Sequence, residues 1–412
     1  MSSEGATKGL RGWIDARFPM TKMWEEHLSK YYAPKNFNFW YFFGSLALLV
    51  LVIQIVSGIW LTMNYKPDAK LAFSSVEYIM RDVDWGWLIR YIHTTGASMF
   101  FVIIYLHMFR GIIYGSFRKP RELIWLFGMV IFLCLMGEAF MGYLLPWGQM
   151  SYWGAQVITS LFGAIPYVGG SLMTWIRGDF TISGITLNRF FALHVVALPL
   201  VIIFLVIGHI LALHEVGSNN PDGIEIKDHK DANGVPLDGI PFHPYYTVKD
   251  IMGVVAFLIV FAAIVFFMPS MGGKFLEAPN FEPANALKTP PHIAPVWYFT
   301  PFYAILRSVP NKLGGVMTMF GSLVMLFLLP WIDRGRAKSI RYRGLGFKIA
   351  VALFVVAFFG LGYIGTVPPT PTYTHLARVF AVVYYGFFIF LWVYTYFGLE
   401  KTKPVPERVT FK

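Results

Sequence analysis

Long apolar stretches separated by short polar segments form the dominant pattern of this 412-residue sequence. Eight of the stretches are long enough to cross a bilayer, which takes about 20 residues each. They lie near residues 39–63, 88–113, 122–143, 189–213, 249–268, 313–331, 346–366 and 377–398. Lipid cannot satisfy free backbone groups, so each stretch must be helical. The pattern therefore predicts an all-α integral membrane protein with eight transmembrane helices.

The predicted helices divide the chain into an N-terminal interfacial segment (1–38), a four-helix bundle (39–213), an inner loop (214–248) and a C-terminal four-helix domain (249–412). In the first part, residues 13–18 and 23–28 mix aromatic with charged side chains. That mixture is typical of a helix lying at the membrane surface, with an ordinary surface helix as the alternative. The outer links 144–188 and 269–312 are too long for turns and should form structured caps.

Composition supports the membrane interpretation. Hydrophobic residues are 56% and charged residues 14% of the chain, against about 45–50% and about 25% in soluble domains. The net charge is +11, with Lys and Arg concentrated in the links after the second and sixth stretches and in the C-terminal tail. This distribution places both termini on the cytoplasmic side of the membrane and gives no reason to expect a nucleic-acid partner. Cys134 lies in an apolar stretch, so neither a disulfide framework nor a thiolate metal site is expected.

Four histidines lie inside two of the predicted helices, His93 and His107 in the second, His194 and His209 in the fourth. Spacings of 14 and 15 residues put each pair near one helix face, roughly 21 Å apart. These helices run in the same direction, so the first histidines should face each other, as should the second. Zinc would need further N, S or O ligands, whereas two imidazoles suffice for a haem. We therefore expect two stacked haems inside the bundle, although a lone intramembrane histidine is often only a core residue. The spacing from His194 to His209 is one residue longer than that from His93 to His107, which should turn or tilt one of the ligands slightly.

Glycines repeat at the same period. Gly44 and Gly58 in the first helix, and Gly128 and Gly142 in the third, are each separated by 14 residues. Small residues let a flat ring or another helix approach the backbone. Helix packing is the alternative explanation, but the matched depth favours an inner ring beside Gly44 and Gly128 and an outer ring beside Gly58 and Gly142.

Three arginines near the histidines are candidates for the haem propionates. Arg90 and Arg189 lie at the depth of the outer ring, and Arg110 at that of the inner ring. Charged residues at the membrane edge are functional candidates by default. For Arg110, extension of the side chain to the interface is the alternative.

Five motifs identify a family resemblance. They are GYLLPWGQM at 142–150, RFFALH at 189–194, HEVGSNNP at 214–221, PFHPYY at 241–246 and ILRSVPNK at 305–312. With them the chain closely resembles cytochrome b of the cytochrome bc complexes of bacteria and mitochondria, from about Asn38 to the last apolar stretch.

The resemblance implies a quinol:cytochrome c oxidoreductase that runs a Q cycle. Quinol is oxidised at an outer site, and one electron leaves through a Rieske iron–sulfur subunit and a c-type cytochrome. The other passes from an outer, low-potential haem b (His93 and His194) to an inner, high-potential haem b (His107 and His209), and then to quinone at an inner site. Protons are released outside and taken up inside. The complex is expected to be a homodimer.

By the same resemblance, the inner quinone site comprises His214, Ser218, Lys249 and Asp250. An imidazole and a carboxylate can hydrogen-bond the two quinone carbonyls and deliver protons. Asp250 as a charge at a helix N-terminus is the alternative.

The outer quinol site is expected to involve Phe140, Tyr143, Gly154, Pro295, Trp297, Tyr298 and Tyr303. Here the chain departs from the commonest family pattern, Pro-Glu-Trp-Tyr, because Val296 stands in place of the proposed proton-accepting glutamate. Glu138 lies one helical turn before Gly142, where relatives usually carry a small neutral residue. We hypothesise that Glu138 takes over the proton-handling role, with a purely structural carboxyl group as the alternative.

Two other classes of protein fit parts of this pattern. Plastid-type and other membrane dihaem b proteins share paired histidines, but the plastid type divides after the fourth helix, whereas this chain is continuous. A transporter or channel could use the histidines to line a proton path.

Overall fold

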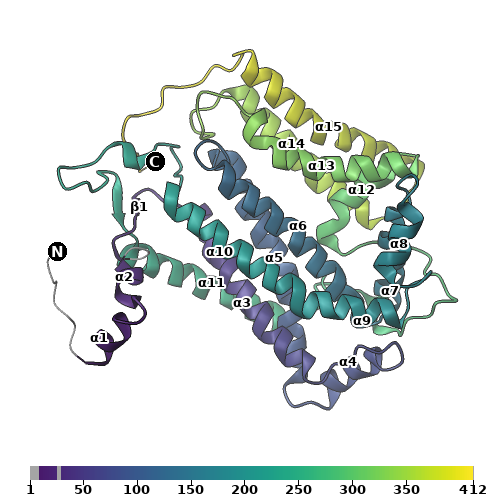
Figure 1. Cartoon of the computed structure of the whole chain (residues 1–412). Helices are drawn as coiled ribbons and strands as arrows, with labels where there is room; N and C mark the ends of the chain where they lie inside the picture. The colour runs from purple at the N-terminus through teal and green to yellow at the C-terminus, as the bar shows by residue number, and fades with distance from the viewer. Residues whose placement is uncertain (1–8, 26–28, 412) are drawn as a thin grey trace.

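A computed structural model describes residues 9–25 and 29–411 (Figure 1). In this part of the chain, 8 helices are long and apolar enough to cross a membrane, which confirms the predicted fold class. They are α3 (Phe42–Thr62), α5 (Gly86–Tyr114), α6 (Glu122–Leu144), the continuous run of α9 (Gly184–Ala192), η3 (Leu193–Ala197) and α10 (Leu198–Val216), α11 (Thr247–Phe267), α13 (Lys312–Ile332), α14 (Leu345–Thr366) and α15 (Pro371–Tyr396).

Shorter elements connect these helices. They are α1 (Leu10–Asp15), α2 (Met20–Trp24), η2 (Phe39–Tyr41), α4 (Ala72–Arg81), α7 (Gln149–Phe162), α8 (Gly169–Arg177), η4 (Ile226–Asp228), η5 (Phe242–Tyr246), η6 (Ala278–Phe281), η7 (Trp297–Phe299), α12 (Thr300–Ser308) and the antiparallel strands β1 (Tyr32–Pro34) and β2 (Gly239–Pro241). Both expected outer caps thus contain helices. Of the expected interfacial stretches, α1 covers part of 13–18, and residues 26–28 lie outside the described part of the chain.

Several helices extend beyond the hydropathy-based limits because polar residues continue them at the membrane surface. The last span is an example, since α15 begins at Pro371 rather than near residue 377. The Thr370 side chain accepts a hydrogen bond from the Tyr373 backbone N–H. Pro371 fits the first helical position because a backbone N–H there would have no partner within the helix. Local capping therefore sets the start of the helix.

The helices form two groups that pack along α6 (Figure 1). In the first group, α3 packs on α5, α6 packs on α10, and α11 covers α3 and α5. In the second, α12 to α15 pack together, and α13 contacts α6. The Trp125 indole donates a hydrogen bond to the Leu326 carbonyl at 2.8 Å, which joins α6 to α13. The described segments nearest the two ends, α1 and the stretch that follows α15, lie at the same end of the bundle, as an even number of spans requires.

Ion pairs attach the inner loop to the helix ends. Glu225 accepts hydrogen bonds from Arg121 at 2.6 and 2.7 Å and from Lys338 at 2.6 Å. Burial alone would raise the pKa of Glu225, but these bonds lower the pKa below its ordinary value. The loop is therefore held to the start of α6 and to the link between α13 and α14.

Candidate functional site

The structure brings the four intramembrane histidines together in two pairs at two depths. The rings of His93 and His194 have centroids 6.2 Å apart, and those of His107 and His209 are 6.4 Å apart. Each pair joins α5 to the α9–α10 span. Across residues 9–25 and 29–411, three or more His, Cys, Asp or Glu side chains never gather into a group suited to a metal ion. Each site therefore offers two protein ligands, the number that a haem requires.

The extra residue between His194 and His209 is absorbed by a local change of helix type. His194 lies in the π-helical turn η3, directly before α10. A π-bulge accommodates one additional residue in an otherwise α-helical segment. The 15-residue spacing on this span therefore matches the 14-residue spacing on α5 in depth, and both histidine pairs can face each other.

The four glycines each lie against one of these imidazoles. The pairs are Gly44 with His107, Gly58 with His93, Gly128 with His209 and Gly142 with His194. A Cβ at the first three positions would lie 3.3–3.4 Å from a ring carbon, whereas at Gly142 it would overlap the ring. The glycines thus leave room for the imidazoles, and their depths agree with the expected inner and outer rings.

Two arginines beside the histidines carry buried nitrogen atoms that need an anion. Nη1 of Arg90 and Nε of Arg110 are buried, and neither has a hydrogen-bond partner among the described residues. A buried cation without a counter-charge is costly. Anionic propionates would satisfy both groups, so the bis-imidazole pairs, the glycines and these arginines together fit two haems.

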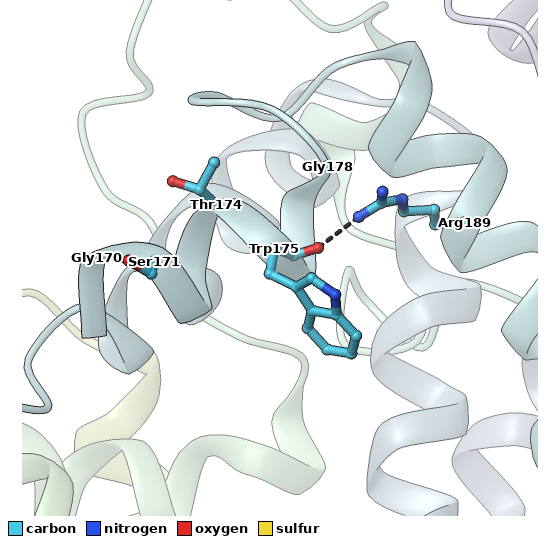
Figure 2. A pocket seen from close by; sticks show the side chains of 6 residues that line it. All are labelled: Gly170, Ser171, Thr174, Trp175, Gly178 and Arg189. Atoms are coloured by element: carbon cyan, nitrogen blue, oxygen red, sulfur yellow. Dashed lines mark hydrogen bonds between the residues drawn. The ribbon is translucent and has the colours of Figure 1, made fainter. Parts of the chain in front are cut away.

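Arg189 has a different environment. Its Nη1 donates a hydrogen bond of 2.5 Å to the Trp175 carbonyl in α8. Figure 2 shows this contact at the edge of a surface pocket that Gly170, Ser171, Thr174 and Gly178 also line. The side chain therefore faces the outer cap, and its contact with a propionate stays a prediction.

The polar groups that lie near Nδ1 differ from one histidine to the next. His93 Nδ1 lies 2.9 Å from Ser57 Oγ, and His194 Nδ1 lies 2.9 Å from the Glu138 carbonyl and 3.0 Å from its Oε1. At the inner pair, the Arg110 guanidinium lies 3.4 Å from His107 Nδ1. An acceptor oxygen therefore lies beside Nδ1 of each outer imidazole, and a guanidinium lies beside Nδ1 of His107.

An apolar cavity of about 220 Å³ opens between α6, α7 and the second outer cap. Among the predicted outer-site residues, its lining includes Phe140, Gly154, Pro295 and Tyr303. Its lining also includes Met136 and Gly137, which directly precede Glu138. The cavity has the size and apolar lining to hold a small ring compound.

The remaining predicted outer-site residues are packed beside this cavity. The Trp297 indole donates a hydrogen bond to Ser98 at 3.2 Å, and the Tyr298 ring stacks on Phe101 at 3.9 Å. Val296 is buried. These contacts fix the second outer cap on α5.

Glu277 is an acidic residue near the outer cavity that the sequence analysis missed. The Tyr143 hydroxyl donates a hydrogen bond to the Glu277 carboxylate, and the Asn280 amide donates one to Tyr143 at 2.9 Å and one to Glu277 at 3.4 Å. Burial raises the pKa of Glu277 to about 7, although the Tyr143 bond opposes this rise. The sequence does show an acidic residue at this position, in a link that carries few charges. Glu282 in the same link is equally acidic, so the sequence pattern could not have selected Glu277.

At the inner side, Tyr31 joins two of the predicted quinone-site residues. Its hydroxyl lies 3.1 Å from Ser218 Oγ, and its ring lies 4.7 Å from the His214 ring. Tyr31 also contacts Phe242, at the start of the span whose first turns carry Lys249 and Asp250. The sequence pattern gave no indication of Tyr31, since it precedes the first apolar stretch.

Comparisons with known proteins agree with this geometry. A family described as Cytochrome b/b6/petB matches residues 28–217, and one described as Cytochrome b(C-terminal)/b6/petD matches residues 283–385. The chain is 63% identical to cytochrome b of Allochromatium vinosum over 100% of both chains. It is 52% identical to cytochrome b of Rickettsia prowazekii over 97% of each. A solved structure titled "Hyperthermophilic respiratory Complex III" matches with a TM-score of 0.86 and 40% identity, covering 93% of this chain and 98% of that one.

Proposed function

Because this chain belongs to the cytochrome b family, we propose that it is the dihaem electron-transfer subunit of a respiratory quinol:cytochrome c oxidoreductase. The observation that carries the proposal is the pair of bis-imidazole sites at two depths between the same two spans. His93 and His194 would hold the outer haem, and His107 and His209 the inner one. When bound, these haems supply reversible one-electron transfer across the membrane.

The proposed reaction is a Q cycle, with quinol oxidation at the outer cavity and quinone reduction at the inner site. Apolar side chains of α6, α7 and the second cap line the cavity and would hold the quinol ring. Partners would be a Rieske iron–sulfur subunit and a c-type cytochrome, in a homodimeric complex; the match to a structure titled as a respiratory complex III supports an assembly with such partners. The positive-inside distribution supports an orientation with both termini in the cytoplasm, and the likeness to bacterial cytochromes b supports a bacterial inner membrane.

For the outer proton acceptor, the geometry favours Glu277. Its carboxylate accepts a hydrogen bond from Tyr143, which packs against Gly154 in the cavity wall, and its pKa of about 7 suits a base that works near neutral pH. Glu277 then takes the role that Val296 cannot perform. The hypothesis that Glu138 accepts this proton stays a prediction, and its Oε1 instead faces His194.

For the inner site, we propose that Ser218 and His214 hold the quinone, with Asp250 and Lys249 supplying protons from the cytoplasmic side. Tyr31 supports the first two residues through its contacts with both. A hydroxyl and an imidazole can both hydrogen-bond a quinone carbonyl, and the imidazole can exchange a proton with it.

The visible spectrum of the purified, reduced complex tests the proposal. It should contain two b-type bands, and the His209→Leu variant should keep the outer band and lose the higher-potential inner one. A protein without b-type absorption would instead support the transporter interpretation of the histidines. Inhibitors specific for the outer and inner quinone sites, titrated against haem b reduction, would then assign the two sites separately.

A further inference from the structure

The C-terminal tail that follows α15 runs back to the inner loop and ends beside it (Figure 1). Residues 401–407 of this tail are irregular, and most of their side chains are exposed. Residues 408–411, which we call the C-terminal strap, then lie between the inner loop and the N-terminal segment. Val409 is buried with Ile224 and Ile226 of the loop. The strap therefore joins the second helix group to a loop of the first.

Two buried carboxylates of the inner loop bind the strap. Asp222 accepts hydrogen bonds from the Thr410 backbone N–H at 2.7 Å and from the Thr410 hydroxyl at 3.1 Å. Asp238 accepts two from the Arg408 guanidinium, at 2.6 and 3.0 Å, and one from the Val409 N–H at 3.3 Å. The two aspartate side chains are 0% and 1% exposed, so their oxygens depend on protein donors rather than on water.

The same two carboxylates also hold the N-terminal segment. The Asn36 amide donates a hydrogen bond to Asp222 at 3.0 Å, and the Lys35 ammonium pairs with Asp238 at 2.9 Å. The Asn36 amide also donates to the Thr410 carbonyl at 3.3 Å. Each carboxylate thus binds groups from the strap and from the N-terminal segment, and the strap closes the junction between this segment and the loop.

This junction is linked to the contact between Tyr31 and Ser218 at the proposed inner quinone site. Strand β1 connects the two places, because Tyr31 directly precedes it and Lys35 directly follows it. Its antiparallel partner β2 directly follows Asp238. The strap is therefore anchored at one end of a two-stranded sheet whose other end carries Tyr31.

The two sides of the contact between Tyr31 and Ser218 are anchored differently. Beside Ser218, the buried Asn219 amide donates a hydrogen bond to the Tyr114 carbonyl at the end of α5 at 2.8 Å. This bond fixes the start of the inner loop to the helix bundle. Tyr31 belongs to the N-terminal segment, which reaches the loop through β1 and the strap-bound carboxylates. The position of Tyr31 against Ser218 therefore depends on how firmly the strap holds this segment.

We propose that the C-terminal strap positions Tyr31 in the inner quinone site and thereby sets the affinity of this site for quinones. This inference rests on the proposed function of the inner site. The strap residues are positioning residues, since their bonds reach the site through Asp222, Asp238 and β1. A looser strap gives Tyr31 more conformational freedom in the empty site, and a ligand must then order this side chain when it binds, at a cost in affinity.

The test is the dissociation constant of an inner-site inhibitor, measured by titration of haem b reduction in the purified complex. A chain that ends at Glu407 lacks the strap and should bind the inhibitor about fivefold more weakly, because binding must then order Tyr31. Its inner loop keeps the ion pairs with Arg341 and Lys35, so the shortened protein should still fold. Binding of an outer-site inhibitor should not change.

Arg408→Gln is a milder variant with a matched control in the same tail. It removes the charge that binds Asp238 and should weaken the inhibitor by about twofold. Lys403→Gln removes the same charge from an exposed side chain outside the strap and should bind the inhibitor as the parent does.

A double-variant cycle separates positioning from a general loss of stability. When Tyr31→Ala is already present, shortening the chain at Glu407 should weaken the inhibitor by less than about twofold, because the side chain that the strap positions is gone. A merely structural strap would produce the same loss with or without the Tyr31 side chain.

Three outcomes would overturn the inference: an unchanged inner-site dissociation constant in the shortened chain, an equal loss of outer-site inhibitor binding, or losses from shortening and from Tyr31→Ala that simply add. If the shortened complex cannot be isolated, Arg408→Gln decides, since a dissociation constant equal to that of the parent would reduce the strap to a structural contact. A parent complex whose haem b reduction responds to no inner-site inhibitor would reject the proposed inner site itself, which separates the two failures.

Discussion

The hydroxyl of Tyr143, near the end of α6, donates a hydrogen bond to the carboxylate of Glu277 in the second outer cap. The two residues are 134 positions apart in the sequence. Tyr143 packs against Gly154, which lines the outer cavity. The contact therefore places a titratable carboxyl group one residue away from the cavity wall, in a chain in which Val296 replaces the acid of the commonest family pattern.

Glu277→Gln should slow quinol oxidation by about 100-fold, because the variant removes the proposed proton acceptor. The pKa of Glu277 is raised to about 7, so the parent carries a proton on this group below that pH and loses it above. Activity of the parent should therefore rise as the pH passes through about 7, and the variant should lack this rise. Steady-state rates of quinol-dependent cytochrome c reduction across pH measure both effects.

The control for this variant is Glu282→Gln, an exposed position in the same link, which should keep the parent profile. If Glu277→Gln also kept the parent rates while Glu138→Gln lost them, Glu138 would be the proton acceptor.

Gly142→Ala should abolish or strongly reduce binding of the outer haem, because the added Cβ would overlap the His194 ring. Gly44→Ala should retain most haem, since its Cβ would make a contact of 3.4 Å with His107. The ratio of b-type absorbance to protein in each purified variant checks the order. Equal haem content in the two variants would show that the outer site can move to accept the methyl group.

Arg343→Ala should destabilise the protein by about 3–5 kcal/mol, the usual cost of removing one partner from a buried ion pair. The Arg343 guanidinium is fully buried and bonds Asp333 and Glu400, both at 2.7 Å, so its loss leaves two buried carboxylates. Thermal unfolding of the detergent-solubilised protein measures the change.

Arg81→Ala provides the comparison for this loss. Arg81 pairs with Glu77 on α4, but its side chain is 75% exposed, and surface pairs contribute at most about 1 kcal/mol. A loss of stability at Arg81 as large as that at Arg343 would contradict the argument from burial.

Tyr31→Phe should weaken binding of an inner-site inhibitor by about fivefold, because it removes the hydroxyl that contacts Ser218 and keeps the ring beside His214. The expected change corresponds to one hydrogen bond of about 1 kcal/mol. Inhibitor titration of haem b reduction measures the dissociation constant. Tyr32→Phe, at the next position, should bind the inhibitor as the parent does, and an equal loss there would indicate a general disturbance of the N-terminal segment.

The sequence by itself determined the eight spans, the depth of each histidine and the matching depth of the glycines. These features follow from hydrophobic length and from the rise and turn of a helix, which are local properties of the chain. The direction of each helix in the bilayer then allowed His93 to be matched with His194 and His107 with His209.

Only the tertiary structure decided which polar groups meet. The approach of Glu277 to Tyr143 and of Tyr31 to Ser218 joins segments far apart in the sequence, so no local pattern contains it. The rotation of α6 against the α9–α10 span directs the Glu138 carboxyl group toward His194, and the packing of α8 directs Arg189 toward Trp175. Helical periodicity fixes the face on which a side chain lies, but the partner on that face depends on how the helices pack.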